Sequence, residues 1–114
     1  MSRSSITTDL EEAGLSEGTT EDWLPNVHPG EILLEDYLEP MGLTKNALAT
    51  AIGVPATRIG QLVRGRRSIT ADTDLRLSRY FGTSEGFWLR LQNAYDLMEA
   101  RRSGHYQEIE PRAA

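Results

Sequence analysis

Five cationic side chains lie between Pro40 and Ala71 with no carboxylate among them, although the chain of 114 residues carries a formal net charge of −5. They are Lys45, Arg58, Arg64, Arg66 and Arg67. A local reversal of charge in an acidic protein indicates a surface that binds a polyanion. Guanidinium groups suit this task because their planar set of donors matches phosphate oxygens and base edges.

Four residues of one short segment have side chains suited to reading base edges. Arg58 can donate two hydrogen bonds to guanine O6 and N7, and Gln61 can pair with adenine N6 and N7. The methyl groups of Ala56 and Thr57 can contact a thymine methyl. We expect these four residues to read bases in the major groove of DNA.

Phosphate contacts are expected from residues at helix ends and in the loop that follows. Hydroxyls and cations at such places fix the register of a protein on DNA without reading sequence. These residues are Thr44, Lys45, Arg64, Arg66, Arg67 and Ser68. The alternative is a solvated charged face without a ligand, but the absence of acids and the helical pattern of the segment favour DNA.

The segment that carries these residues has the pattern of two short helices joined by a tight turn. Ala49, Gly53 and Ile59 follow one another at intervals of four and six residues. The small residue lets the helices approach, the glycine permits a positive φ in the turn, and the aliphatic residue anchors the second helix in the core. The pattern therefore predicts helices over residues 45–52 and about 55–64.

Helical periodicity continues on both sides of this unit. Residues 29–41 are predicted to form one helix, whose apolar stripe comprises Leu34, Tyr37, Leu38 and Met41. Thr44 and Thr70 are suitable N-caps for the helices that follow them. The helix after Thr70 is expected to bury Leu77, Tyr80 and Phe81.

The last predicted helix, over about residues 84–102, has more apolar surface than one small bundle can cover. Two alternatives remain open, closure of the core or contact with a second subunit, and we expect a combination of both. The residues assigned to a dimer interface are Phe87, Trp88, Leu91, Tyr95 and Met98. No strand pattern competes with these helices, so the expected fold is all-α with five helices over residues 25–103.

Residues 1–24 differ in composition from the rest of the chain. They hold six acids against Arg3 alone, while the remainder has eleven acids and eleven bases. They contain few large apolar groups, which is typical of segments that cannot offset the entropy cost of folding. We predict a flexible, disordered acidic arm over residues 1–24 and a short flexible tail over residues 104–114.

Several classes of protein are disfavoured by the composition. The N-terminus lacks the basic start and apolar stretch of a secretory signal, no apolar run approaches the roughly 20 residues that span a bilayer, and the chain has no cysteine. A cytoplasmic protein without a membrane partner is expected. The two histidines form no zinc-binding pattern and no serine has a nucleophile-elbow context, so we expect no enzyme activity, no metal and no cofactor.

Residues 28–101 closely resemble the HigA family of antitoxins, within the larger Xre group of repressor-like helix-turn-helix domains. The resemblance is carried by HPGE from His28, by RSITADT from Arg67, and by RYFGT from Arg79, which leads to Phe87 and Gln92. Where the family often has Ser-Gln this chain has Thr44-Lys45, so an operator sequence does not transfer from relatives.

The resemblance implies an antitoxin that binds and neutralises a HigB-like toxin, an mRNA endonuclease of the RelE-like class. It also implies repression of the antitoxin's own operon by a homodimer on a palindromic operator in double-stranded DNA. A stand-alone Xre-type repressor without a toxin is the alternative. The acidic arm either competes for the basic surface of the toxin or serves only as a solubilising tail.

Overall fold

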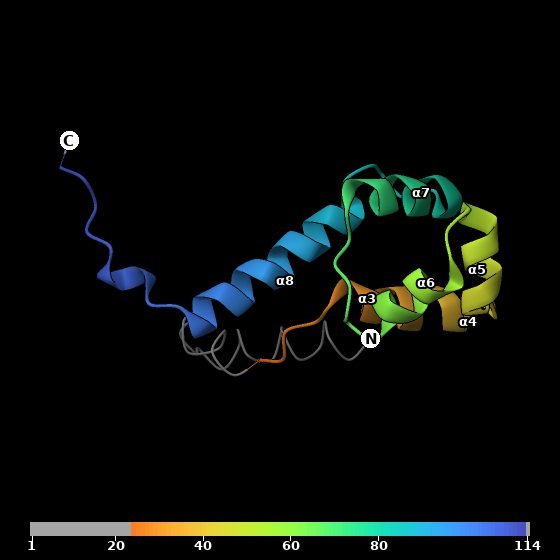
Figure 1. Ribbon diagram of the computed structural model, residues 1–114, viewed down its shortest axis with the longest axis horizontal. Helices are drawn as coiled ribbons and strands as arrows, with labels where there is room; N and C mark the ends of the chain where they lie inside the picture. Colours follow the sequence, from red (N-terminus) through yellow and green to blue (C-terminus); the bar gives the residue numbers. More distant parts are fainter. Residues whose placement is uncertain (1–23, 114) are drawn as a thin grey trace, which may run out of the picture.

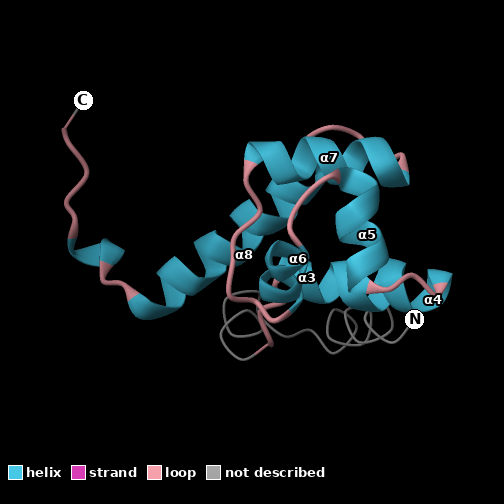
Figure 2. Cartoon of the chain, turned by 45° about the vertical axis from the view of Figure 1, so that its right-hand side comes forward, coloured by secondary structure: helices cyan, strands magenta, loops and turns pink. Residues whose placement is uncertain are grey.

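The computed structural model describes residues 24–113, which fold entirely into helices and connecting loops (Figures 1 and 2). In chain order the elements are α3 (Pro29–Ile32), η1 (Leu33–Leu38), α4 (Glu39–Met41), α5 (Lys45–Ile52), α6 (Ala56–Val63), α7 (Ala71–Phe81), α8 (Phe87–Ser103) and η2 (Tyr106–Glu108). The first three run on as one helix, so the predicted all-α, five-helix fold is confirmed. The predicted arm, apart from residue 24, lies outside the described residues.

The first helix contains a wide turn that the sequence pattern did not predict. Over η1 the helix is a π-helix, and the N–H of Glu39 donates to the carbonyl of Leu34, five residues back. The turn immediately precedes Pro40, whose ring lacks a donor and would clash with a carbonyl four residues back in a regular α-helix.

The π turn changes which residues of this helix face the core, because a wider turn shifts the following residues out of a 3.6-residue period. Met41, predicted in the apolar stripe, is 58% exposed, which corrects that prediction. Leu33, outside the predicted stripe, is fully buried, while Leu34 and Tyr37 are partly buried against the core.

The helix-turn-helix forms as predicted. Thr44 Oγ1 accepts a hydrogen bond from the Ala47 N–H at 3.0 Å and so caps α5. Gly53, with φ of 75°, ends that helix in the left-handed conformation. Ala49 and Ile59, at 2% and 0% exposure, hold α5 and α6 together in the core.

Trp88 is the largest fully buried side chain and occupies the centre of the core. Its ring lies 5.1 Å from that of Tyr37 and 5.2 Å from that of Phe87, centroid to centroid. Since Trp88 is 0% exposed within one chain, it offers no surface to a second subunit, and its assignment to a dimer interface is corrected. Tyr80, expected in the core, is instead 45% exposed on α7.

Only the first part of α8 packs on the bundle, and the remainder projects away from it (Figure 1). The segment before α3 runs along this projecting part, where Asn26 Nδ2 donates to the Tyr95 carbonyl at 2.9 Å and to Glu99 Oε2 at 3.1 Å. Leu97 on α8 is 57% exposed. None of the helices within residues 24–113 is long and apolar enough to cross a membrane.

Candidate nucleic-acid interface

The structure brings all four predicted base-reading residues onto α6. Ile59 and Leu62 anchor this helix in the core at 0% exposure, whereas Ala56 and Thr57 at its first turn are exposed. Arg58 and Gln61 are partly buried because each contacts a neighbouring side chain.

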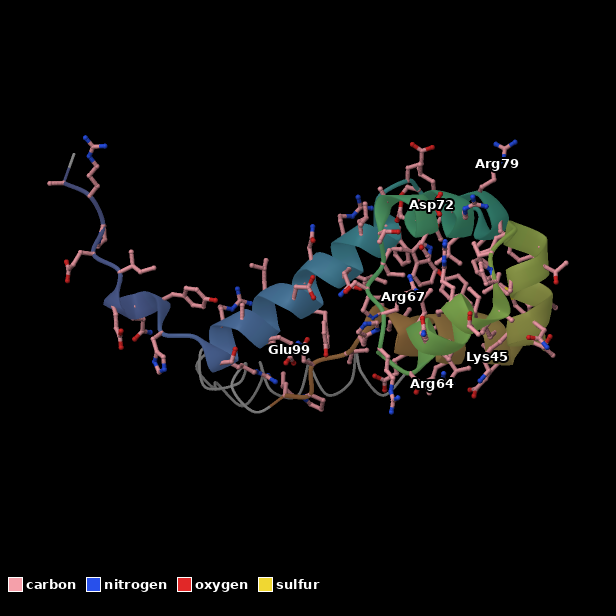
Figure 3. The ribbon with its side chains drawn as sticks, viewed as in Figure 1. Lys45, Arg64, Arg67, Asp72, Arg79 and Glu99 are labelled. Carbon is pink, nitrogen blue, oxygen red and sulfur yellow. The ribbon has the colours of Figure 1, made fainter. Side chains whose placement is uncertain are left out.

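The residues predicted to contact phosphates lie at the ends of α5 and α6 and in the loop over residues 64–70, and all six are exposed. In the view of Figure 3, Lys45 at the start of α5 and Arg64 after α6 lie along one edge of the ribbon, with Arg79 of α7 at the opposite edge. The predicted phosphate-binding residues therefore flank the helix-turn-helix, at the start of α5 and after the end of α6.

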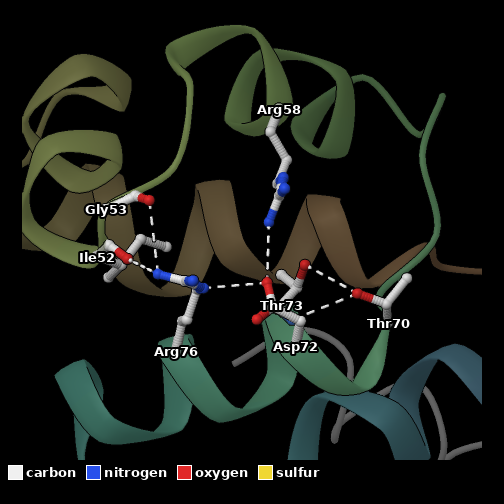
Figure 4. Close-up of polar contacts among 7 residues, drawn as sticks. All are labelled: Ile52, Gly53, Arg58, Thr70, Asp72, Thr73 and Arg76. Carbon is white, nitrogen blue, oxygen red and sulfur yellow. Dashed lines mark hydrogen bonds and ion pairs between the residues drawn. The ribbon is translucent and has the colours of Figure 1, made fainter.

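Arg58 is not a free base reader, because its guanidinium is paired with a carboxylate from α7. Arg58 Nη1 donates to Asp72 Oδ2 at 3.1 Å, and the same oxygen accepts from Arg76 Nε at 3.0 Å (Figure 4). Arg76 Nη1 in turn donates to the carbonyl of Ile52 at 2.7 Å. The network links α5, α6 and α7.

Sequence reasoning missed this network, because Asp72 lies in the first turn of α7, 14 residues from Arg58, and no periodic pattern links the two. The hydrogen bond from Arg76, assisted by Arg58, lowers the pKa of Asp72 below its usual value, so the group is a carboxylate at neutral pH. The segment without acids thus ends at Asp72, and the fold places the carboxylate of Asp72 against Arg58. Because the pair is exposed to solvent, its contribution to stability is small.

Gln61 is held by a second arginine. Arg67 Nε donates to Gln61 Oε1 at 2.9 Å, and because a guanidinium only donates, the glutamine oxygen must be the acceptor. The amide NH₂ of Gln61 is left to face a ligand as a donor. The predicted adenine contact uses Oε1 as well, and because an amide oxygen has two lone pairs, Oε1 can accept from Arg67 and from adenine N6 together.

The basic loop is anchored at both ends, which fixes where its cations lie. At its start Gly65, with φ of 72°, packs beside the ring of His28. At its end the N–H of Ile69 donates to Gln92 Oε1 at 2.7 Å. Gln92 is 3% exposed, and its Nε2 donates to Asp96 Oδ1 at 3.0 Å. The α8 helix therefore supports the loop that carries Arg66, Arg67 and Ser68.

His28 supports the other end of the loop in its neutral form. Its Nδ1 accepts a hydrogen bond from the Gly30 N–H at 2.9 Å and so caps α3, and its ring lies 4.9 Å from that of Tyr95. Burial lowers the pKa of His28, and the nearby charges of Asp96 and Glu31 and a hydrogen bond with the Arg67 backbone only partly oppose this.

We expect His28 to make stability depend on pH. Its pKa is lower in the folded than in the unfolded protein. Its contribution to the free energy of unfolding is therefore fully present at pH values above the unfolded pKa, about 6.5, and is lost as the pH falls toward the folded pKa. Urea unfolding of the wild type should therefore show a loss of stability below pH 6.5 that His28→Asn, which can still cap α3, does not show. An identical pH dependence in both proteins would contradict the role of His28.

A protein-family model described as helix-turn-helix matches residues 34–88. Virulence-associated protein I of Dichelobacter nodosus is 56% identical over 79 residues, which cover 69% of this chain and 73% of the relative. Antitoxin HigA-1 of Vibrio cholerae is 40% identical over 82 residues, covering 72% and 75% of the two chains.

A solved structure described as the Pseudomonas aeruginosa antitoxin HigA with the higBA promoter has the same fold. It matches with a TM-score of 0.73 and 42% identity, over 76% of this chain and 98% of that chain. Similarity at this level in sequence and structure, together with the helix-turn-helix geometry, shows that the chain belongs to the HigA family of Xre-type helix-turn-helix proteins.

Proposed function

We propose that this protein is an antitoxin that represses its own operon by binding a palindromic operator as a homodimer and that neutralises a HigB-like mRNA endonuclease. The observation that carries the proposal is the basic face of the helix-turn-helix, supported from α7 and α8, in a chain 42% identical to an antitoxin solved with its promoter. The alternative is a stand-alone repressor.

In this proposal α6 enters the major groove of DNA. Arg58 and Gln61 reach base edges, with Ala56 and Thr57 at the same end of the helix, and the exposed cations and hydroxyls of the surrounding loops bind phosphates. A homodimer presents two such helices to one face of a palindrome, about 34 Å apart.

The proposed dimer interface lies on α8. Phe87 and Leu91, near its start, are partly exposed although they pack against the core, and Tyr95 and Met98, further along the helix, are partly exposed near the exposed Leu97. Light scattering of the wild type should give the mass of two chains, and Met98→Asp should shift the mass to one chain while leaving the helical content unchanged. An intact dimer in Met98→Asp would place the interface elsewhere.

Removing single cations should weaken DNA binding in a salt-dependent manner. A variant that makes one fewer bond to phosphate should have a slope of log affinity against log salt that is shallower by about 0.9. Arg64→Ala and Arg66→Ala should therefore bind all duplexes more weakly and with a shallower slope, as fluorescence anisotropy over a salt series can measure. Arg79→Ala is the matched control because it removes the same charge from the opposite edge (Figure 3), and an equal effect of all three variants would contradict the assigned face.

Capture of the tagged protein from its native cells tests the toxin partner. Recovery of a small basic protein whose expression alone halts growth, and whose effect co-expression of this chain abolishes, would support the antitoxin. Recovery of this chain alone, with selective DNA binding retained, would favour the stand-alone repressor.

A further inference from the structure

We propose that Asp72 is a positioning residue for DNA recognition, which holds Arg58 of the neighbouring helix in the orientation that reads one guanine. The inference rests on the proposed operator binding and names a residue that sets its specificity. Asp72 itself lies on α7, outside the helix-turn-helix, and needs no contact with a base.

The carboxylate of Asp72 is also held by Arg76, a residue of its own helix. Arg76 Nε donates to the oxygen that also accepts from Arg58 Nη1, and Arg76 is itself bonded to a backbone carbonyl at the end of α5 (Figure 4). Arg76 thus connects Asp72 to the backbone of α5. Because this contact fixes the carboxylate, Arg58 binds a partner that does not move with it.

The remaining donors of Arg58 are suited to guanine. A guanidinium has five N–H donors in a rigid plane, and one bond to Asp72 leaves enough donors for the O6 and N7 atoms of one base. An unrestrained arginine loses rotamer freedom when it binds. Because Asp72 already holds Arg58, the side chain loses less rotamer freedom on binding. A base that fits the fixed guanidinium plane is therefore bound with higher affinity than a base that does not fit it.

The charge of Asp72 also acts against wrong contacts. Its oxygen neutralises part of the Arg58 charge, and a carboxylate at this place repels phosphates that approach α6 out of register. Asp72 therefore favours a matched base over contacts with phosphate groups alone. A purely mechanical link between α6 and α7 would instead strengthen binding to every duplex alike.

The experiment compares duplexes that differ in one guanine atom. The wild type selects its duplex from a random-sequence pool, and each guanine is then replaced in turn by 7-deazaguanine, which lacks the N7 acceptor. At one position the wild type should lose about fivefold or more in affinity. Asp72→Ala should bind the selected duplex more weakly and show less than about a twofold loss at that position.

Four variants control for folding and charge. Glu85→Ala removes the same charge from the exposed loop before α8 and should keep the wild-type penalty for 7-deazaguanine. Arg58→Ala should lack the penalty, and adding Asp72→Ala to it should change nothing further. Asp72→Asn keeps the size of the side chain without its charge and should fall between the wild type and Asp72→Ala, with circular dichroism reporting the fold of each variant.

Two results would overturn the inference while leaving operator binding intact. One is an Asp72→Ala variant that keeps the wild-type penalty and weakens all duplexes equally, and the other is an Arg58→Ala variant that keeps the penalty. A wild type that selects no sequence from the pool would instead overturn the proposed function.

Discussion

Replacing Asp74 with alanine is expected to remove much of the stability of the domain. Its carboxylate is 1% exposed and accepts three backbone hydrogen bonds at the start of α8, from the N–H groups of Gly86 at 2.7 Å, Trp88 at 2.8 Å and Leu89 at 3.1 Å. Each buried donor left without an acceptor costs about 1–3 kcal/mol, so we expect a loss of roughly 3–5 kcal/mol. The free energy of unfolding of such a domain is only about 5–15 kcal/mol in total.

Urea unfolding followed by circular dichroism measures this loss. Asp72→Ala is a matched control on the same helix. The carboxylate of Asp72 is exposed, so its removal should change the urea midpoint only slightly. Asp74→Asn keeps the shape but turns one acceptor into a donor, so it should also destabilise strongly. Equal midpoints for the alanine variants at positions 72 and 74 would show that Asp74 does not hold α8 in place.

Replacing Gly30 with alanine is the second change with a large expected effect. A Cβ at this position would lie 1.6 Å from the carbonyl oxygen of Leu62 and 3.1 Å from the Cα of Val63, both atoms of the α6 backbone. Backbone cannot rotate away as a flexible side chain can, so α3 and α6 must move apart. We expect a loss of about 3 kcal/mol or more, at the upper end of the range for overpacked sites.

Since α6 carries the proposed base-reading residues, only folded molecules can bind DNA. The apparent DNA affinity of Gly30→Ala should therefore fall in proportion to its folded fraction. Gly60→Ala is the matched control, because the atoms nearest to its Cβ would belong to the flexible side chain of Arg64, at 3.6 Å. Alanine there should stabilise α6 by about 0.5–1 kcal/mol, as expected for a glycine inside a helix. If Gly30→Ala is as stable as Gly60→Ala in urea, the close approach of α3 to α6 does not exist in solution.

Features that depend on neighbours within a few residues could be predicted from the amino-acid sequence. The Thr44 cap bonds a residue three positions ahead, and Gly53 ends α5 through its own backbone conformation. Helix periods and caps of this kind can be read without knowing the fold. For the same reason the five helices, the helix-turn-helix and the position of the basic residues could all be predicted.

Contacts between residues far apart in the sequence could be learned only from the packing of the helices. Asp72 reaches Arg58 over 14 residues, and Gln92 reaches Ile69 over 23, with no periodic signal to indicate either pair. An apolar pattern likewise shows that Trp88 is hydrophobic but not whether its own chain or a partner covers it. These outcomes depend on how whole helices pack, because burial and pairing are set by the neighbours that the fold supplies and not by spacing along the chain.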